Sequence, residues 1–209
     1  MLKSLFVKTA VLSIVLLFGS CQAILRKVYD LKNPAIENER TILNFAKKYN
    51  LDTTNIVTMN ASDYPEFANG KSIPDADIFD MAGNYIEYRQ SDTSCNAGLF
   101  QFIPDLNRNG KYNQSGKTSL NSIFPKLRNL KGEKLEKITP ADFYILIYWT
   151  VYTGKLNKDH VKIWEELATK NTNAKIKVLK VNLDIQENWG KDQTDKYMKA
   201  FKKSGKKKK

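Results

Sequence analysis

Two different spacings of apolar residues along the chain predict two kinds of secondary structure. Between residues 36 and 49 the apolar side chains recur every three or four positions, which is typical of an amphipathic helix. The stretches Ile24–Leu31 and Asn55–Met59 are short and rich in apolar residues, so each predicts a strand. The chain after its first two dozen residues is therefore expected to run strand, helix, strand.

The clearest local pattern lies in residues 73–89. Two alternating apolar and polar stretches flank Gly83 and Asn84, residues that tolerate the positive φ of a tight turn, so the segment predicts a β-hairpin. The apolar residues that follow Cys95 predict a short helix that ends near Pro104.

The second half of the chain opens with a polar segment, residues 107–138, that predicts a connecting loop with one brief helix. A continuous apolar run over residues 143–148 predicts a strand buried on both faces. An apolar stripe over residues 156–168 predicts a helix, and alternation over residues 174–184 predicts another strand. Together they predict a βαβ unit within residues 139–190, whose two strands run parallel.

The first twenty residues have the composition of an export signal. Lys3 and Lys8 accompany an apolar run over residues 9–18 that is too short to span a bilayer, and small residues lead to Cys21. Residues 1–20 resemble a bacterial lipoprotein signal. That resemblance implies cleavage before Cys21 and acyl chains on this cysteine, which anchor the protein to a membrane. Ordinary secretion with a free Cys21 is the alternative.

Charge and size limit the partners of the protein. The chain of 209 residues is 42% hydrophobic, enough for a core, and has a formal net charge of +12. Residues 1–20 hold two lysines and no acid, so their removal leaves 12 − 2 = +10. The lysine-rich residues 191–209 predict a disordered tail, which is either simply solvated or attracted to an anionic surface such as lipid headgroups. Export argues against nucleic acid as a partner.

The cysteine count excludes one class of activity. Cys21 and Cys95 are the two cysteines of the chain. If Cys21 carries a lipid, a single thiol remains and an intramolecular disulfide is impossible. Dithiol exchange requires an attacking and a resolving thiol, so the count excludes it.

Residues 144–167 resemble the strand, turn and helix of the thioredoxin-like superfamily. Residues 152–157 lie where that family has the sequence W-C-G-P-C-K, so Thr153 and Leu156 occupy the two cysteine positions. The degenerate redox turn consists of Trp149, Tyr152, Thr153, Gly154 and Leu156. The resemblance implies an α/β fold, a thioredoxin-like sheet with flanking helices, in a branch that lacks the two-cysteine motif.

The family also has a cis-proline loop that leads into a hairpin, and residues 73–89 are similar to it, with Ile73–Pro74 as the candidate cis bond. In the family the strand, turn and helix come before this hairpin, whereas here they follow it. One explanation is a permuted or elaborated fold. The other is a small complete unit from Ile24 to Leu106, within an N-terminal half at residues 21–106, to which the βαβ unit is appended.

Cys95 is the candidate reactive residue. It precedes a predicted short helix, whose dipole favours a thiolate. As a reactive thiolate, Cys95 would form a mixed disulfide with a partner or react with a peroxide. The alternative is that Cys95 is a small buried residue beneath Phe100 and Phe102. His160, the single histidine, lies on the apolar stripe of its helix and is interpreted as a packed core residue.

Residues 105–116 match the opening of a calcium-binding loop. Asp105, Asn107 and Asn109 occupy ligand positions, but position twelve is Gly116 instead of a bidentate glutamate. With one carboxylate among the ligands, the pattern favours an ordinary loop. We expect no cofactor.

Three functions are compatible with these residues. The first is a catalytically silent, membrane-anchored thioredoxin-like module whose exposed aromatic turn binds a protein or another envelope component. The second is a redox protein that uses Cys95 and an external thiol, and the third is a structural lipoprotein without a ligand. The lipoprotein resemblance implies the bacterial cell envelope, at the outer membrane of a Gram-negative cell.

Overall fold

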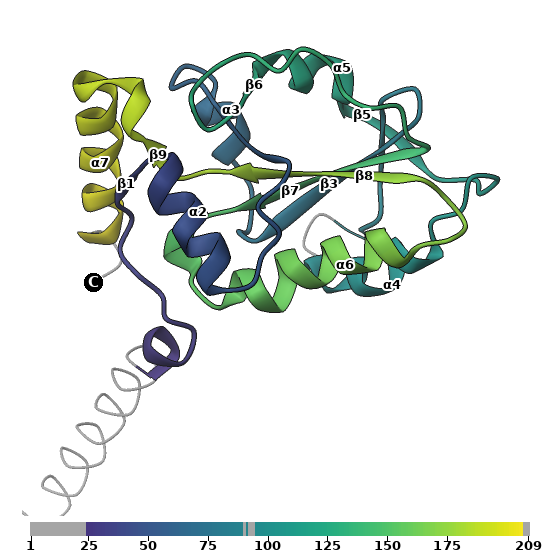
Figure 1. Cartoon of the computed structure of the whole chain (residues 1–209), viewed down its shortest axis with the longest axis horizontal. Coiled ribbons are helices and arrows are strands. Elements are labelled where there is room, and N and C mark those ends of the chain that lie inside the picture. The colour runs from purple at the N-terminus through teal and green to yellow at the C-terminus, as the bar shows by residue number, and fades with distance from the viewer. Residues whose placement is uncertain (1–23, 90, 92–94, 207–209) are drawn as a thin grey trace, which may run out of the picture.

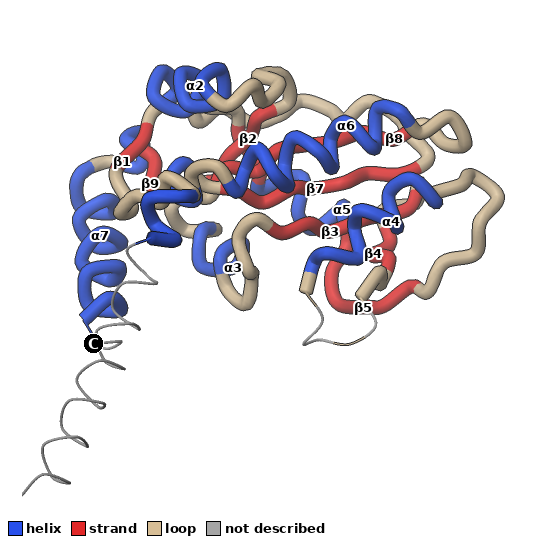
Figure 2. The backbone as a smooth tube through the Cα atoms, turned by 90° about the horizontal axis from the view of Figure 1, so that it is seen from below, coloured by secondary structure: helices blue, strands red, loops and turns tan. Residues whose placement is uncertain are grey.

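The structure, a computed structural model, describes residues 24–89, 91 and 95–206. This part of the chain forms three layers, with helices on both faces of a central mixed sheet (Figures 1 and 2). The fold is therefore of the α/β class.

The central sheet has seven strands among the described residues, in the order β5-β4-β3-β7-β8-β2-β6. The inner strands β7, β8 and β2 run parallel, and β3 and β6 flank them in the antiparallel direction. In chain order the strands are β2 (Ile56–Met59), β3 (Asp75–Asp80), β4 (Asn84–Ile86), β5 (Gln114–Ser119), β6 (Leu127–Arg128), β7 (Phe143–Trp149) and β8 (Ile176–Asn182).

The central strand β7 explains why the sheet is covered on both sides. Its alternate residues enter two separate apolar clusters, with Ile145 and Ile147 on one face and Leu146 and Tyr148 on the other. Each cluster needs its own layer of helices to exclude water. A continuous apolar run, without polar alternation, is the sequence form of such a doubly covered strand.

The first face is covered by α2 (Glu39–Lys48), α4 (Leu99–Asp105) and α6 (Ile163–Lys170), and the second by α3 (Tyr64–Ala68), α5 (Leu120–Ile123) and α7 (Lys191–Lys206). A one-turn π-helix, Lys158–Lys162, leads into α6. Helix α2 begins where Asn38 and Thr41 form a reciprocal capping box.

Most of the predicted elements are confirmed. The helix expected over residues 36–49 corresponds to α2, and the hairpin over residues 73–89 corresponds to β3 and β4. The predicted βαβ unit corresponds to β7, α6 and β8, and its two strands pair in parallel over their whole length.

Three predictions about local structure are wrong. Residues 24–28 are helical, so Ile24–Leu31 is not a strand. Ile36 lies before α2, in the two-residue strand β1 (Ile36–Glu37), which pairs with β9 (Ile185–Gln186). The connecting segment 107–138 contains the two outermost strands, β5 and β6, in addition to a brief helix. The edge strand β5 has polar and mostly exposed residues, and β6 has only two residues, so neither gives the pattern of a strand.

The C-terminal segment is the largest correction. Residues 191–206 form the helix α7, whereas a disordered tail was expected over residues 191–209. The lysines between residues 191 and 203 are exposed, and Tyr197 packs inward, where its hydroxyl donates a 2.7 Å hydrogen bond to the carbonyl of Ala61. The apolar residues Tyr197, Met198 and Phe201 have the spacing of three and four that is typical of a helix, but lysines dominate the composition of the segment.

The strand order distinguishes between a permuted or elaborated fold and a complete N-terminal unit with an appended βαβ unit. Strands β7 and β8 lie between β3 and β2. Residues 24–106 therefore do not form a sheet of their own to which a βαβ unit is added. Both halves of the chain contribute neighbouring strands to one sheet.

Candidate functional site

The turn that follows β7 is a buried, hydrogen-bonded unit. Thr150, Thr153 and Asn157 are each at most 7% exposed. The Thr153 hydroxyl donates to the carbonyl of Thr150 at 2.8 Å, and the Asn157 amide donates to the same carbonyl at 2.8 Å. Buried hydroxyl and amide groups need such partners. Thr153 thus serves to close the turn.

A buried carboxylate fixes the start of this turn. Asp184, just beyond β8, accepts a 2.6 Å hydrogen bond from the backbone amide of Val151 and a 2.8 Å hydrogen bond from the Asn182 side chain. Burial raises the pKa of the Asp184 carboxyl to about 7, although both donors favour its charged form. The nearby carboxylate of Glu37 raises it further.

The N-terminal segment covers the turn. The amide of Lys155 donates to the carbonyl of Tyr29 at 2.7 Å, and the amide of Lys32 donates to the carbonyl of Tyr152 at 2.9 Å. Gly154 permits this approach, because a Cβ added there would lie 2.2 Å from the carbonyl oxygen of Tyr29. We call residues 29–32 the strap.

The aromatic residues of the turn differ from the exposed pair that was expected. Trp149 is completely buried and stacks against Phe45 of α2 at 5.9 Å between ring centroids. Tyr152 is half-buried, and burial raises the pKa of its phenol. Leu156 is also half-buried. The turn therefore presents little free aromatic surface to a partner.

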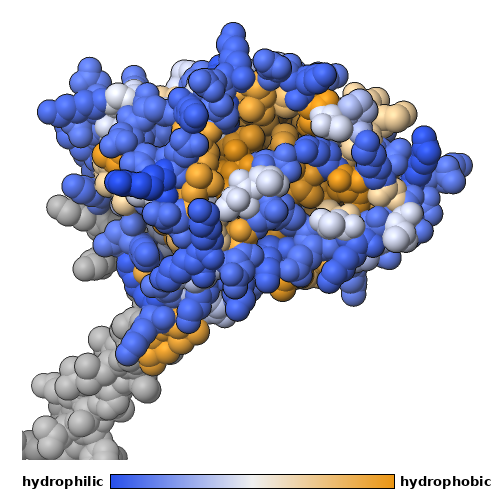
Figure 3. All heavy atoms as spheres, viewed as in Figure 1, coloured by the Kyte–Doolittle hydropathy of each residue, from blue (hydrophilic) through white to orange (hydrophobic). Residues whose placement is uncertain are grey.

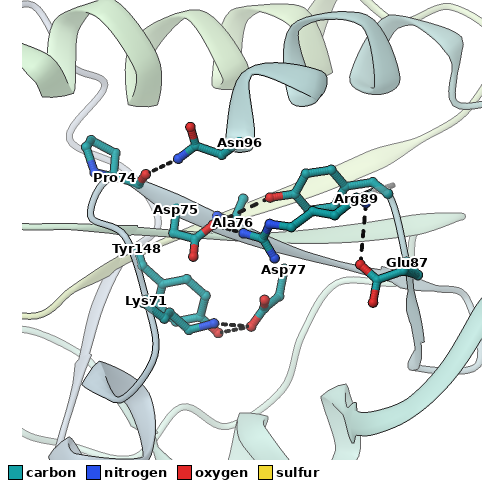
Figure 4. Close-up of polar contacts among 10 residues, drawn as sticks. Lys71, Pro74, Asp75, Ala76, Asp77, Glu87, Arg89, Asn96 and Tyr148 are labelled. Carbon is teal, nitrogen blue, oxygen red and sulfur yellow. Dashed lines mark hydrogen bonds and ion pairs between the residues drawn. The ribbon is translucent and has the colours of Figure 1, made fainter. Parts of the chain in front are cut away.

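The Ile73–Pro74 peptide bond is cis, and it lies beside the turn. Because β3 and β7 are antiparallel with Asp75 opposite Tyr148, the start of β3 is next to the end of β7. The side-chain amide of Asn96 donates to the Pro74 carbonyl (Figure 4).

Two buried carboxylates follow the cis proline on β3. Asp75 forms an ion pair with Arg89, and Asp77 accepts hydrogen bonds from Lys71 and the Tyr148 hydroxyl, both at 2.8 Å (Figure 4). Burial raises the pKa values of the Asp75 carboxyl and the Tyr148 phenol. Both acids are thus paired with cations, and the phenol is held in its neutral form.

The sequence interpretation did not identify this cluster of charges. A signal was present, since Asp75 and Asp77 alternate with apolar residues at the start of the strand β3. A similar pair joins β8 to α6, where the fully buried Lys180 of β8 donates to Glu165 of α6. Satisfied pairs of this kind hold elements in register and leave no group free to act on a substrate.

Cys95 is an exposed free thiol, so the interpretation as a buried residue beneath Phe100 and Phe102 is wrong. It lines an open cavity of about 520 Å³ together with Arg89, Gln101 and Asp105. The following helical turn, Asn96–Gly98, has three residues. The thiol is accessible to a partner or an oxidant.

The remaining candidate residues have structural contacts. His160 is half-buried, its Nδ1 lies 3.0 Å from the Leu156 carbonyl, and its ring packs against Trp164. In the loop that resembles a calcium site, the side-chain oxygen of Asn107 accepts a hydrogen bond from the amide of Asn109. No group of three or more histidine, cysteine or acidic residues in the described structure is placed to hold a metal ion.

No family model, curated protein or solved structure matches this chain. None of the helices described is both long and apolar enough to cross a bilayer.

Proposed function

We propose that the protein is a lipid-anchored, catalytically silent member of the thioredoxin-like superfamily with a permuted chain order, which acts in the bacterial envelope through non-covalent contacts. Two features support the permuted resemblance. The turn after β7 and the cis proline before β3 are adjacent, although the hairpin comes first in the chain. Strands from both halves of the chain are interleaved in one sheet, with β7 and β8 between β3 and β2.

The observation that carries the proposal is the strap. Residues 29–32 are bonded to the backbone on both sides of Gly154, at Tyr152 and Lys155. Thr153 and Asn157 use their polar atoms to close the same turn. A turn that is occupied by its own chain and contains no thiol has no means of exchanging disulfides. Its retained shape serves the core of the fold.

A second function is favoured by the exposure of Cys95. In that alternative the Cys95 thiolate attacks a disulfide of a partner, forms a mixed disulfide and releases the partner's other sulfur as a thiolate. The thiolate of an external thiol then attacks the partner's sulfur in the mixed disulfide, forms a disulfide with it and releases Cys95 as a thiolate.

Thiol trapping in intact cells separates the two functions. Cells that produce the wild-type protein or Cys95→Ser are quenched with acid, alkylated and analysed on a non-reducing gel. A silent module gives the same single band in both samples. A wild-type band of higher mass that is absent from Cys95→Ser would overturn the proposal in favour of the one-cysteine function, and the partner in that band can be identified by mass spectrometry.

A further inference from the structure

The first described residues expose a compact apolar surface. Ile24, Leu25 and Val28 are 59%, 52% and 53% exposed, and all three lie in the helical segment 24–28. Figure 3 shows hydrophobic atoms at the lower left of the molecule, where the described chain begins. Elsewhere in the described structure, large exposed apolar residues occur singly. A group of three within five residues marks an interaction surface.

Basic side chains accompany this apolar surface. Arg26 and Lys27 belong to the same helical segment and are exposed. The last turns of α7 add the exposed residues Lys199, Lys202 and Lys203. From residue 196 to residue 209 the sequence contains eight lysines and no acid.

Tyr152 contacts both the strap, which follows the first basic segment in the chain, and α7, which carries the second. Tyr152 accepts a backbone hydrogen bond from Lys32 of the strap, and its ring lies 6.3 Å from that of Phe201 on α7. In two perpendicular views, residues 24–28 and the end of α7 lie on the same side (Figures 1 and 2). The apolar segment and the lysines thus lie at one end of the molecule.

We propose that this surface rests on a lipid bilayer rich in anionic headgroups, with the apolar side chains inserted at the interface and the lysines against the phosphates. We call it the docking surface; it comprises Ile24, Leu25, Arg26, Lys27, Val28, Lys199, Lys202 and Lys203. The inference rests on the proposed anchoring. Beyond anchoring, it states that the folded domain has a fixed orientation relative to the membrane.

The length of the chain before this surface identifies a bilayer as its occupant. Cys21, the proposed lipidation site, is three residues before Ile24. Three residues span about 10 Å at most, so an acyl chain on Cys21 brings the bilayer to residues 24–28. A protein partner would compete with the membrane for the same position. The positive charge of the docking surface is complementary to anionic headgroups.

The orientation also places the β3–β4 turn away from the membrane. In the β3–β7 pair, Asp75 lies opposite Tyr148 at the end that carries the turn and strap, and Asp80 lies opposite Phe143 at the other end. Met81 follows Asp80 and is 71% exposed. The segment around Met81 therefore serves as an internal reference in a test of docking.

The test uses the full chain, purified from a bacterial envelope and reconstituted into vesicles of phosphatidylglycerol or phosphatidylcholine. Flotation of the vesicles reports anchoring, and hydrogen–deuterium exchange reports docking. We expect exchange in residues 24–31 to be at least tenfold slower on phosphatidylglycerol than on phosphatidylcholine. Exchange in residues 79–86 should be the same on both.

A pair of matched variants tests the role of the lysines. Lys199→Gln with Lys203→Gln should weaken the protection of residues 24–31 about fivefold per lysine. Lys111→Gln with Lys175→Gln removes the same charge from exposed residues at the other end of the molecule, and should have no effect. Protein that floats but shows equal exchange on both lipids would overturn the docking surface and leave anchoring intact. Protein that does not float would overturn the anchoring and the docking surface with it.

Discussion

The backbone amide of Lys155 donates a hydrogen bond to the carbonyl of Tyr29, over a distance of 2.7 Å. This contact joins the start of the folded chain to the turn that resembles a redox motif. The strap and the turn therefore depend on each other. A partner that uses the turn must first displace the strap, and the segment that follows the proposed lipid anchor is fixed to the folded domain.

Replacement of Gly154 tests this dependence. The residue has φ of +57°, and a Cβ would meet the carbonyl oxygens of Tyr29 and Asp30 at 2.2 and 2.3 Å. We expect Gly154→Ala to lower the free energy of unfolding by about 3 kcal/mol, as measured in urea. It should also speed amide exchange at Lys155, because the strap is displaced.

Gly70→Ala is the matched control for backbone strain. Gly70 has φ of +72°, but a Cβ added there would meet no other part of the chain within 4 Å. In Gly70→Ala the free energy of unfolding should therefore fall by about 1 kcal/mol, the cost of a positive φ in a residue with a Cβ. Equal losses in the two variants would show that the close approach of the strap has no energetic consequence.

Asp184 makes stability depend on pH. The ordinary pKa of its carboxyl is 3.8, and burial raises the value in the folded protein to about 7. Between these values the native state keeps a proton that the unfolded chain releases, so stability falls as the pH rises from 4 to 7 and is then constant. The full effect is about 4 kcal/mol.

Asp184→Asn should remove this pH dependence of stability, because asparagine does not titrate. The side-chain oxygen of the asparagine can still accept the hydrogen bond from the Val151 amide. We expect the stability of the variant, relative to wild type, to increase between pH 4 and pH 7 in urea titrations. Asp195→Asn, at an exposed position on α7, should follow the wild-type curve. A wild-type slope retained in Asp184→Asn would assign the pH dependence to other groups.

The proposed correspondence between residues 152–157 and the thioredoxin motif W-C-G-P-C-K predicts that two introduced cysteines can form a disulfide. If Thr153 and Leu156 occupy the two cysteine positions, the double variant Thr153→Cys, Leu156→Cys should close a disulfide under mild oxidation. The measurement is a loss of two mass units and of two reactive thiols. A control pair, Thr153→Cys with Lys155→Cys, should keep both thiols free. Failure of the first pair to close would count against the proposed correspondence.

The docking of α7 depends on Tyr197. Its hydroxyl donates to the Ala61 carbonyl at 2.7 Å, and its ring lies 4.9 Å from that of Tyr64. Tyr197→Phe should cost about 1 kcal/mol of stability and Tyr197→Ala about 2 to 3 kcal/mol. Lys202→Ala, at an exposed position on the same helix, should be neutral. If the two tyrosine variants unfold like wild type, α7 does not contribute to the folded domain.

The sequence predicts the central elements well, for physical reasons. The strand β7 is apolar on both faces, and α6 carries a stripe of apolar residues, so both patterns extend over many positions. The edge strand β5 has the sequence QSGKTS, which is polar and contains glycine. Its structure depends on pairing with β4, which a local pattern does not contain.

The candidate site was harder to predict than the fold. The turn residues were identified through a resemblance, but their burial depends on the strap, which approaches from the other end of the chain. The pairing of Asp75 with Arg89 likewise joins residues 14 positions apart across a hairpin. A sequence shows which reactive side chains a protein has. Whether such a side chain is buried, paired or accessible depends on residues far away in the sequence.

Anchoring through Cys21 is the premise on which both the silent module and the docking surface depend, and the mass of the mature N-terminus tests it most directly. Protein purified from a bacterial envelope should begin at Cys21, with a diacylglycerol thioether on its sulfur and an acyl chain on its amino group. Cys21→Ser should carry no lipid. A mature chain that begins at another residue, or one in which Cys21 is a free thiol, would contradict lipid anchoring.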